Sequence, residues 1–310
     1  MVTLASRDGR VSVLSLALLA TPTSLSANTT TTVIPHLAHS LGVSTADATW
    51  TGTAFGWGAV IGTPLTSALI SVRSPRAAIA SNAGLVVLGT LLTALAPTLP
   101  VLLAGRAAQA VGGGGLVTIA LVLAGTAART GIVTAGIGLI GAFGPPAGST
   151  LSEATWRLPM CLSLLALLAV PSVLRHAHDH PTLGDKPRVD GPGVALVAGL
   201  VSALVLLPRF PLYALTAAAA TILLLAFHIR RRPDGFVPQP VLRSRTFQAA
   251  ATAACALSTS YFTLLYTLPR HLEQHWSADR VGTATLVALA GGSAASLLFT
   301  RRMSRLAPVA

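Results

Sequence analysis

Charged side chains are scarce in this sequence. Only 10% of its 310 residues are Asp, Glu, Lys or Arg, whereas 52% are hydrophobic. A soluble globular domain carries about 25% charged residues, because its surface must face water. The shortage of charge therefore excludes a soluble domain, and it indicates that a lipid bilayer is the solvent of most of the chain.

Groups that catalyse reactions or bind metals are also few. The cysteines, Cys161 and Cys255, are too few and too far apart for a disulfide framework or a metal site, so we interpret them as small buried side chains. His176, His178 and His180 alternate around Asp179, but a solvated loop is a simpler explanation than a metal site. We find no nucleophile–base pair and no phosphate-binding loop, and we predict no enzyme activity and no cofactor.

Long apolar stretches are what the sequence has in abundance. A helix of about 20 apolar residues crosses the roughly 30 Å hydrocarbon core of a bilayer. Proline-containing connections separate most of the stretches, which indicates that each one is a separate span. We therefore predict an all-α integral membrane protein, a bundle of about ten transmembrane helices at 11–34, 50–71, 79–96, 101–124, 131–151, 158–174, 193–208, 211–229, 247–268 and 281–300.

The basic residues predict the orientation of these spans. Lys and Arg concentrate in the cytoplasmic segments of membrane proteins. With the N-terminus inside, the outer segments hold only Arg157, Arg209, Arg270 and Arg280. We therefore predict an N-in, C-in protein of the cytoplasmic membrane, and we interpret the net charge of +12 as this bias plus attraction to anionic lipid. Nucleic-acid binding is a weaker explanation of this net charge. For the first span, the alternative is a cleaved signal peptide near residues 11–27.

The span at 101–124 contains a basic and an amide side chain. Arg106 lies inside the apolar stretch, and Gln109 lies one turn further along the same face. Because a guanidinium is costly in lipid, we expect Arg106 to face the bundle interior or a wet cavity. The alternative is an arginine that extends its head group outward to the membrane surface.

Glycines recur at spacings of three and four in the span at 131–151. This spacing places them on one helix face that can lie almost flat against a partner helix. Two prolines, Pro145 and Pro146, remove backbone donors and should bend the same span. We predict a bent packing helix whose contact face is formed by Gly138, Gly141, Gly144 and Gly148.

These two spans resemble a known family. Arg106-x-x-Gln109-x-x-Gly112 resembles the fourth-helix motif of the major facilitator superfamily, and Gly144-Pro145-x-x-Gly148 resembles the fifth-helix motif of its drug antiporters. The extra hairpin at 193–229 is similar to that of the 14-span drug:proton antiporters. The resemblance implies a six-helix bundle at 1–174, cytoplasmic loops at 175–192 and 230–246, and an incomplete C-terminal bundle of two helices at 247–310.

The sequence departs from the family pattern at the inner loop. Ser67 and Ser74 stand where the family has glycines, and Ser71 stands where it has the aspartate that helps to latch an inner gate. Arg73 and Arg76 remain as candidate gate residues. The alternative is that these two arginines only contribute to the cytoplasmic excess of positive charge.

Candidates for the transport path also depart from the pattern. Ser26 occupies the position at which many of these antiporters carry an aspartate in the first helix. Asn28 is our strongest candidate for a substrate contact in this polar helix. The alternative is that the polar residues of this helix bond their neighbours or their own backbone. Glu153 is the acid closest to the interior of a span, and the alternative is an outer-loop carboxylate near Arg157.

The resemblance implies a transporter that exports small amphipathic compounds by alternating access, with proton coupling as an open possibility. Its partners would be a small-molecule substrate, protons and membrane lipid. The alternative is a degenerate or truncated membrane protein without a transport cycle. Since four further helices would be expected after the tenth span, we expect a truncated relative or one that completes itself as a homo-oligomer.

Overall fold

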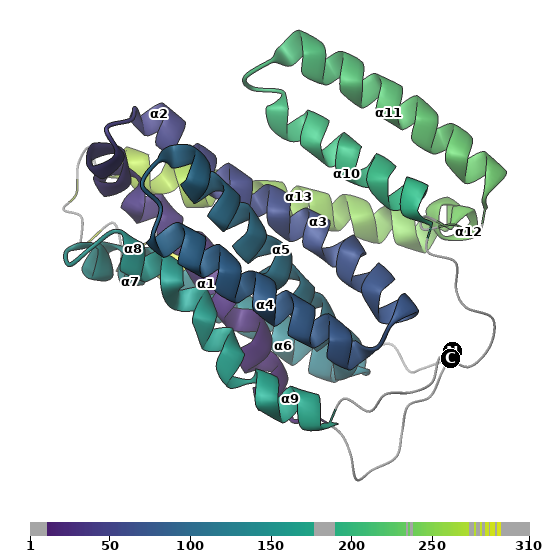
Figure 1. The fold of residues 1–310 in the computed structure, drawn as a ribbon, viewed down its shortest axis with the longest axis horizontal. Helices are drawn as coiled ribbons and strands as arrows, with labels where there is room; N and C mark the ends of the chain where they lie inside the picture. Colours follow the sequence, from purple (N-terminus) through teal and green to yellow (C-terminus); the bar gives the residue numbers. More distant parts are fainter. Residues whose placement is uncertain are drawn as a thin grey trace. The chain divides into compact units, whose positions relative to one another are not determined.

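The computed structural model describes residues 11–176, 190–233, 235 and 238–272, together with scattered residues between 276 and 292. In this part of the chain every regular element is a helix (Figure 1). The described residues up to 176 belong to one compact unit, and residues 190–271 belong to a second. The all-α prediction is therefore confirmed for the described residues.

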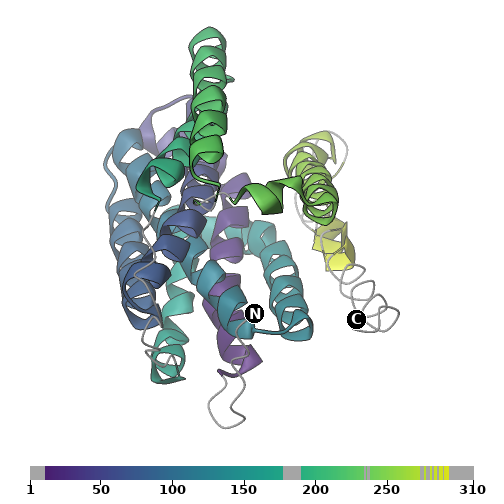
Figure 2. The same cartoon turned by 90° about the vertical axis from the view of Figure 1, so that its right-hand side faces the viewer.

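The described part of the first unit is a bundle of long helical segments, some of which are divided into shorter helices. Figure 2 shows these helices standing side by side. Their bounds are α1 Val13–Leu41, α2 Thr45–Ala48, α3 Trp50–Val72, α4 Pro75–Ala94, α5 Leu99–Ala124, α6 Ala127–Ala142, α7 Gly144–Ser152, α8 Arg157–Met160, the 3-10 helix η1 Cys161–Leu168 and α9 Val170–His176.

The second unit begins with a helical hairpin. Helix α10 spans Gly191–Leu206 and α11 spans Pro211–Arg231, and the two pack against each other in antiparallel orientation (Figure 1). Small side chains line their contact, where Ala203, Ala214 and Ala218 are buried. The short helix α12, Gln239–Arg243, and the long helix α13, Arg245–Leu272, follow.

Among the described residues, six helical segments are long and apolar enough to cross a membrane. They are Thr45–Ile70, Pro75–Ala94, Leu99–Ala124, Ala127–Ser152, Arg157–His176 and Pro211–Arg231, and α10 is a shorter apolar helix. These segments agree with a multi-pass membrane protein, whereas ten spans and the N-in, C-in orientation stay predictions. Most of the predicted span at 281–300 and most of the loop at 175–192 lie outside the described residues.

Helix α1 is longer than the predicted span at 11–34, so that boundary was wrong. The helix continues through Pro35 and ends at Gly42, whose φ of 63° provides a left-handed C-cap. The nitrogen of Val43 closes this cap by donating to the carbonyl of Ala38 at 3.0 Å. Proline is tolerated inside a membrane helix when packing and side-chain bonds compensate for the lost donor.

Helix α5 is the central helix of the first unit. It packs against α3, α4 and α1, and Figure 1 shows it between α3 and α4. Its consecutive glycines, Gly112–Gly115, point in directions about 100° apart, since a helix turns by this angle per residue. A side chain at Gly112 would meet α4, one at Gly113 would meet α1, and one at Gly114 would meet α3. The glycine run therefore lets three helices approach one helix at once.

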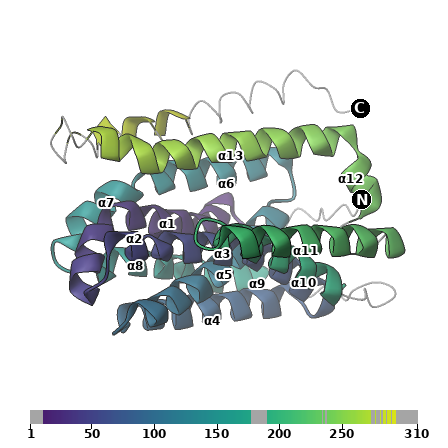
Figure 3. The same cartoon turned by 90° about the horizontal axis from the view of Figure 1, so that it is seen from above.

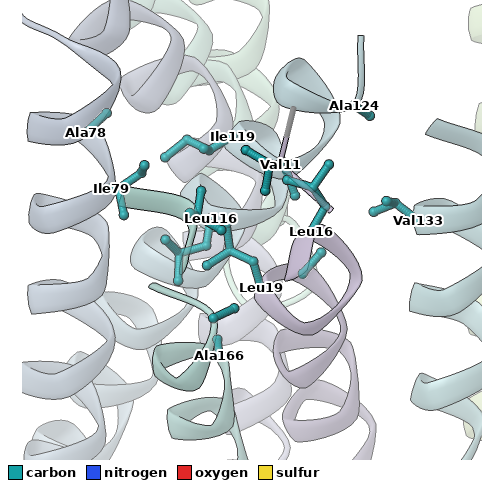
Figure 4. Close-up of a cluster of buried hydrophobic side chains, with 14 of the residues drawn as sticks. Val11, Leu16, Leu19, Ala78, Ile79, Leu116, Ile119, Ala124, Val133 and Ala166 are labelled. Atoms are coloured by element: carbon teal, nitrogen blue, oxygen red, sulfur yellow. The ribbon is translucent and has the colours of Figure 1, made fainter. Parts of the chain in front are cut away.

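Two apolar clusters fill the ends of this unit. Figure 4 shows the larger cluster, in which side chains from several helices meet. Its buried members include Leu16, Leu19, Ile79, Leu116 and Ile119. The smaller cluster surrounds a buried tryptophan and contains Val33, Leu37, Ala38, Ala48, Ala96, Leu102, Trp156 and Met160. The polar site described next lies on α1 and α5 between the residues of these two clusters.

Candidate functional site

Arg106 of α5 is fully buried and donates hydrogen bonds to oxygen atoms of α1 and α5. Its Nη1 donates to Gln109 Oε1 at 2.6 Å and to Ser26 Oγ at 3.2 Å. Its Nη2 donates to Thr30 Oγ1 at 2.9 Å and to the Ser26 carbonyl at 3.2 Å. The prediction that Arg106 faces the bundle interior is therefore confirmed, and the alternative of an outward-reaching side chain is excluded.

Gln109 extends this polar site from α5 to two further spans. It is fully buried, and its Nε2 lies 2.8 Å from Thr90 Oγ1 of α4, 2.8 Å from the Met160 carbonyl and 2.6 Å from Ser163 Oγ of η1. The Met160 carbonyl also accepts from Ser26 Oγ at 3.1 Å. A carbonyl oxygen has two lone pairs, so this one atom can join α1, α5 and the 157–176 segment.

Phe55 brings α3 to the same site. The guanidinium carbon of Arg106 lies 4.3 Å from the centroid of the Phe55 ring, and the ring is itself buried. A cation over an aromatic face gains about 2 kcal/mol when both are shielded from water. We call the set Ser26, Phe55, Thr90, Arg106, Gln109 and Ser163 the Arg106 cluster. The cluster joins α1, α3, α4, α5 and η1. A structure that exposes Arg106 to a solute must first break several of these contacts.

The glycine face of α6 and α7 lies against α1, as Figure 3 shows for the neighbouring ribbons. Asn28 Nδ2 donates to the Gly141 carbonyl at 2.9 Å, and Thr32 Oγ1 donates to the Pro145 carbonyl at 3.2 Å. A Cβ added at Gly144 would lie 2.5 Å from Asn28 Cβ, and one at Gly148 would lie 2.7 Å from the Thr29 carbonyl. The two helices therefore touch backbone to backbone.

The bend predicted for this span lies at Phe143. Helix α6 ends at Ala142 and α7 begins at Gly144, immediately before Pro145 and Pro146. The two prolines provide no N–H, so the i→i−4 ladder cannot continue through them. The bend is thus explained by the prolines, and the glycines on both sides of it keep α1 in contact with each half.

Gly112 packs α5 against α4. A Cβ at this position would clash with the Asn82 carbonyl and lie 2.8 Å from the Val86 nitrogen. Asn82 is itself buried, and its Nδ2 donates to Thr66 Oγ1 at 3.0 Å and to the Ala78 carbonyl at 2.8 Å. Asn82 and Thr66 thus form a second polar contact, between α4 and α3, which was not predicted from the sequence.

The remaining predicted site residues lie at the ends of the helices. Arg73 follows α3 and Arg76 lies in the first turn of α4, and both are exposed. Glu153 is exposed at the end of α7. Their roles in gating or proton transfer stay predictions.

Several members of the Arg106 cluster were missed by the sequence. Thr90 and Ser163 come from other helices, as does the Met160 carbonyl that Gln109 also contacts. Phe55 is one of three aromatic residues in α3. Isolated hydroxyl side chains inside apolar stretches were the available signal, because a polar group in lipid needs an internal partner.

Among the described residues no group of His, Cys, Asp and Glu is placed to hold a metal ion. His178 and His180 lie outside those residues.

Together, the apolar helices and their buried polar contacts define a multi-pass helical membrane protein. Residues 16–309 match the Major Facilitator Superfamily, and the chain belongs to this family. It is also 25% identical over 291 residues to MFS transporter L2 of Phoma sp. (strain ATCC 20986 / MF5453). That alignment covers 84% of this chain and 48% of the relative, so the chain spans about half of the relative's length. That relative is named as a transporter, and transport by this chain is a proposal.

Proposed function

We propose that this protein exports small amphipathic compounds across the cytoplasmic membrane by alternating access. In this mechanism one helical bundle rocks against another, and a central site faces the two sides of the membrane in turn. Helices α1 and α5 and the α6–α7 pair would line the path. The support for this proposal is the family membership and the position of the buried Arg106 cluster on α1 and α5.

The Arg106 cluster is the observation that carries the proposal. A fully buried guanidinium is expensive in a membrane and is retained where it serves a function. The acceptors described for Arg106 include two hydroxyl groups, and an anionic oxygen accepts about twice as strongly as a neutral one. A substrate with an anionic or strongly polar group would therefore compete with Ser26 and Thr30 for the guanidinium when the path opens.

The contact between α1 and the α6–α7 pair would limit leakage. Because the glycines allow the backbones to touch, this contact leaves little space for ions or water to pass along it. Asn28, which we predicted as a substrate contact, donates to the Gly141 carbonyl in this structure. We propose that this hydrogen bond breaks when α1 moves and that the Asn28 amide then becomes available to the solute.

A proton gradient is part of the proposal as the driving force, because the motifs resemble those of drug:proton antiporters. In the described part of the first unit the carboxylates are Asp47 in α2 and Glu153 at the end of α7. Ser26, at the position of the family's aspartate, binds Arg106 through its hydroxyl and carbonyl groups. Glu153 is therefore the residue of this unit that we propose to exchange protons.

The test is a flux measurement in proteoliposomes with a panel of amphipathic dyes and antibiotics. Each compound is measured with and without a pH gradient, and empty liposomes provide the background. The proposal predicts protein-dependent flux of at least one compound and a faster rate with the gradient. A flux that is independent of the pH gradient would remove proton coupling from the proposal. Rates equal to those of empty liposomes for every compound would contradict transport.

One observation favours a second candidate, a membrane scaffold without a transport cycle. Arg106 and Gln109 are fully buried and bonded by the protein itself, so the cluster also fits a purely structural role. The sequence also departs from the family pattern at four serines: Ser26 and Ser71 stand where the family has aspartates, and Ser67 and Ser74 stand where it has glycines. Background flux for every compound from a well-folded protein would support this candidate.

A further inference from the structure

Five exposed arginines lie at the C-terminal end of α11 and in the segment that follows it. Arg230 and Arg231 form its last turn, and Arg232 follows as the C-cap. Arg243 ends α12 and Arg245 begins α13, and both are also exposed. Asp234 is the only acidic residue in the sequence from 230 to 246. This segment therefore carries a strong positive charge, and all of it belongs to the second unit.

The end of α11 is held in place by the start of α10, as Figure 1 shows for the two ribbons. The Nε2 atom of His228 lies 2.8 Å from both carboxylate oxygens of Asp190. Asp190 is buried and also accepts from the Gly193 nitrogen at 3.1 Å, which caps α10. The arginines follow His228 directly, so this contact fixes the helix end that carries them.

The turn after α11 is also closed by backbone hydrogen bonds. The Arg232 nitrogen donates to the His228 carbonyl at 2.8 Å, and the Gly235 nitrogen donates to the Arg232 carbonyl at 3.0 Å. Helix C-termini carry partial negative charge, which favours cations at this position. The three arginines are thus presented from a defined helix end.

Exposed apolar side chains occur in the same stretch of sequence as the arginines, and one of them contacts Arg231. The guanidinium carbon of Arg231 lies 4.2 Å from the centroid of the Phe227 ring, and Phe227 is 54% exposed. Val241 of α12 and Phe247 of α13 are exposed as well. Exposed aromatic and aliphatic groups next to arginine are typical of the boundary between acyl chains and head groups.

We propose that Arg230, Arg231 and Arg232 form a binding site for the head groups of anionic phospholipids. A guanidinium presents several N–H donors in a planar fork that fits phosphate oxygens. In the predicted orientation this end of α11 faces the cytoplasmic leaflet, where anionic lipids attract basic residues next to a span. The site depends on the membrane surface and not on the transport cycle, so it stands independently of the proposed function.

The experiment measures lipid selectivity of the full chain in vesicles by electron paramagnetic resonance. Spin-labelled phosphatidylglycerol and spin-labelled phosphatidylcholine are compared in vesicles of unlabelled phosphatidylcholine. We expect the wild type to prefer phosphatidylglycerol, and the preference to fall as salt rises. Replacing all three arginines by glutamine should lower the relative association constant at least about tenfold at low ionic strength.

Two further variants separate a head-group site from general charge. The triple variant Arg73→Gln, Arg76→Gln and Arg175→Gln removes the same charge from exposed positions elsewhere, and it should keep most of the preference. Replacing Arg230, Arg231 and Arg232 by lysine keeps the charge and should restore much of the binding. Helix content and monodispersity in detergent are measured for every variant.

Several outcomes would overturn the proposal. A wild type without preference for phosphatidylglycerol would do so even if the glutamine variant cannot be purified. Equal losses in the glutamine variant and in the matched control would show that the preference comes from total charge. Displacement of the labelled lipid by inorganic phosphate at constant ionic strength would show a site for free anions instead.

Discussion

The contact between α1 and α7 makes Gly144 intolerant of even one added methyl group. In Gly144→Ala the new Cβ would lie 2.5 Å from Asn28 Cβ and 3.0 Å from the Leu25 carbonyl. Carbon atoms prefer a separation of about 3.5–4.0 Å, so the two helices must move apart by about 1 Å. Gly136→Ala is the matched control, because its Cβ would meet α1 at ordinary distances, 3.5 Å from Thr21 Cγ2.

The expected difference follows from three contributions. Overpacking costs about 1–3 kcal/mol. Separation also weakens the hydrogen bond from Asn28 Nδ2 to the Gly141 carbonyl, which is 2.9 Å long and contributes about 1 kcal/mol. Replacing glycine by alanine returns about 1 kcal/mol of helix propensity in both variants. We therefore expect Gly144→Ala to lower the free energy of unfolding by about 1–3 kcal/mol, and Gly136→Ala to leave it unchanged or slightly higher.

Unfolding by denaturing detergent, followed by circular dichroism in mixed micelles, measures this difference. Both variants are compared with the wild type at the same protein concentration. Equal stability of the two variants would refute the reasoning, because the close approach at Gly144 would then have no cost. Greater damage from Gly136→Ala would refute it as well, since that position has room for a methyl group.

Three further changes test other contacts. Asn82→Val leaves the buried Thr66 hydroxyl without this partner, and we expect a loss of about 1–3 kcal/mol in the same unfolding assay. Thr66→Val added to that variant should cost much less than Thr66→Val alone, which a double-mutant cycle measures. His228→Leu should speed amide hydrogen exchange at the start of α10, because Asp190 loses its hydrogen bond to the imidazole. Unchanged exchange would show that this contact does not hold the hairpin.

The positions of helices and their polar faces could be predicted from the sequence, but the neighbouring helices that pack on those faces could not. Arg106 and Gln109 were expected on one face because residues three apart in a helix are neighbours, and the 2.6 Å hydrogen bond between them agrees. Thr90 and Ser163, which complete the polar site, are separated from Gln109 by 19 and 54 residues. Helical periodicity describes a face but does not identify the helix that packs on it, so these partners were not predictable.

The glycine face shows the same limit. Spacings of three and four indicated a flat surface, but only the fold shows that α1 covers it and that Asn28 reaches the Gly141 carbonyl. The first span was predicted to end near residue 34, whereas α1 continues through Pro35, although proline usually terminates a helix in water. In a membrane, tertiary contacts outweigh this local preference, and the helix continues to Leu41.

The central claim is that transport depends on the Arg106 cluster. The most direct measurement is the initial rate of solute flux in proteoliposomes that contain equal amounts of wild type, Arg106→Ala or Arg209→Ala. Arg209 is an exposed arginine in the connection between α10 and α11 and serves as the control. We predict that Arg106→Ala lowers the rate at least about tenfold, because the solute loses its charge-assisted hydrogen bonds to the guanidinium, worth about 1.5–3 kcal/mol each. Arg209→Ala should keep the wild-type rate. A full rate from a correctly inserted Arg106→Ala protein would contradict the claim.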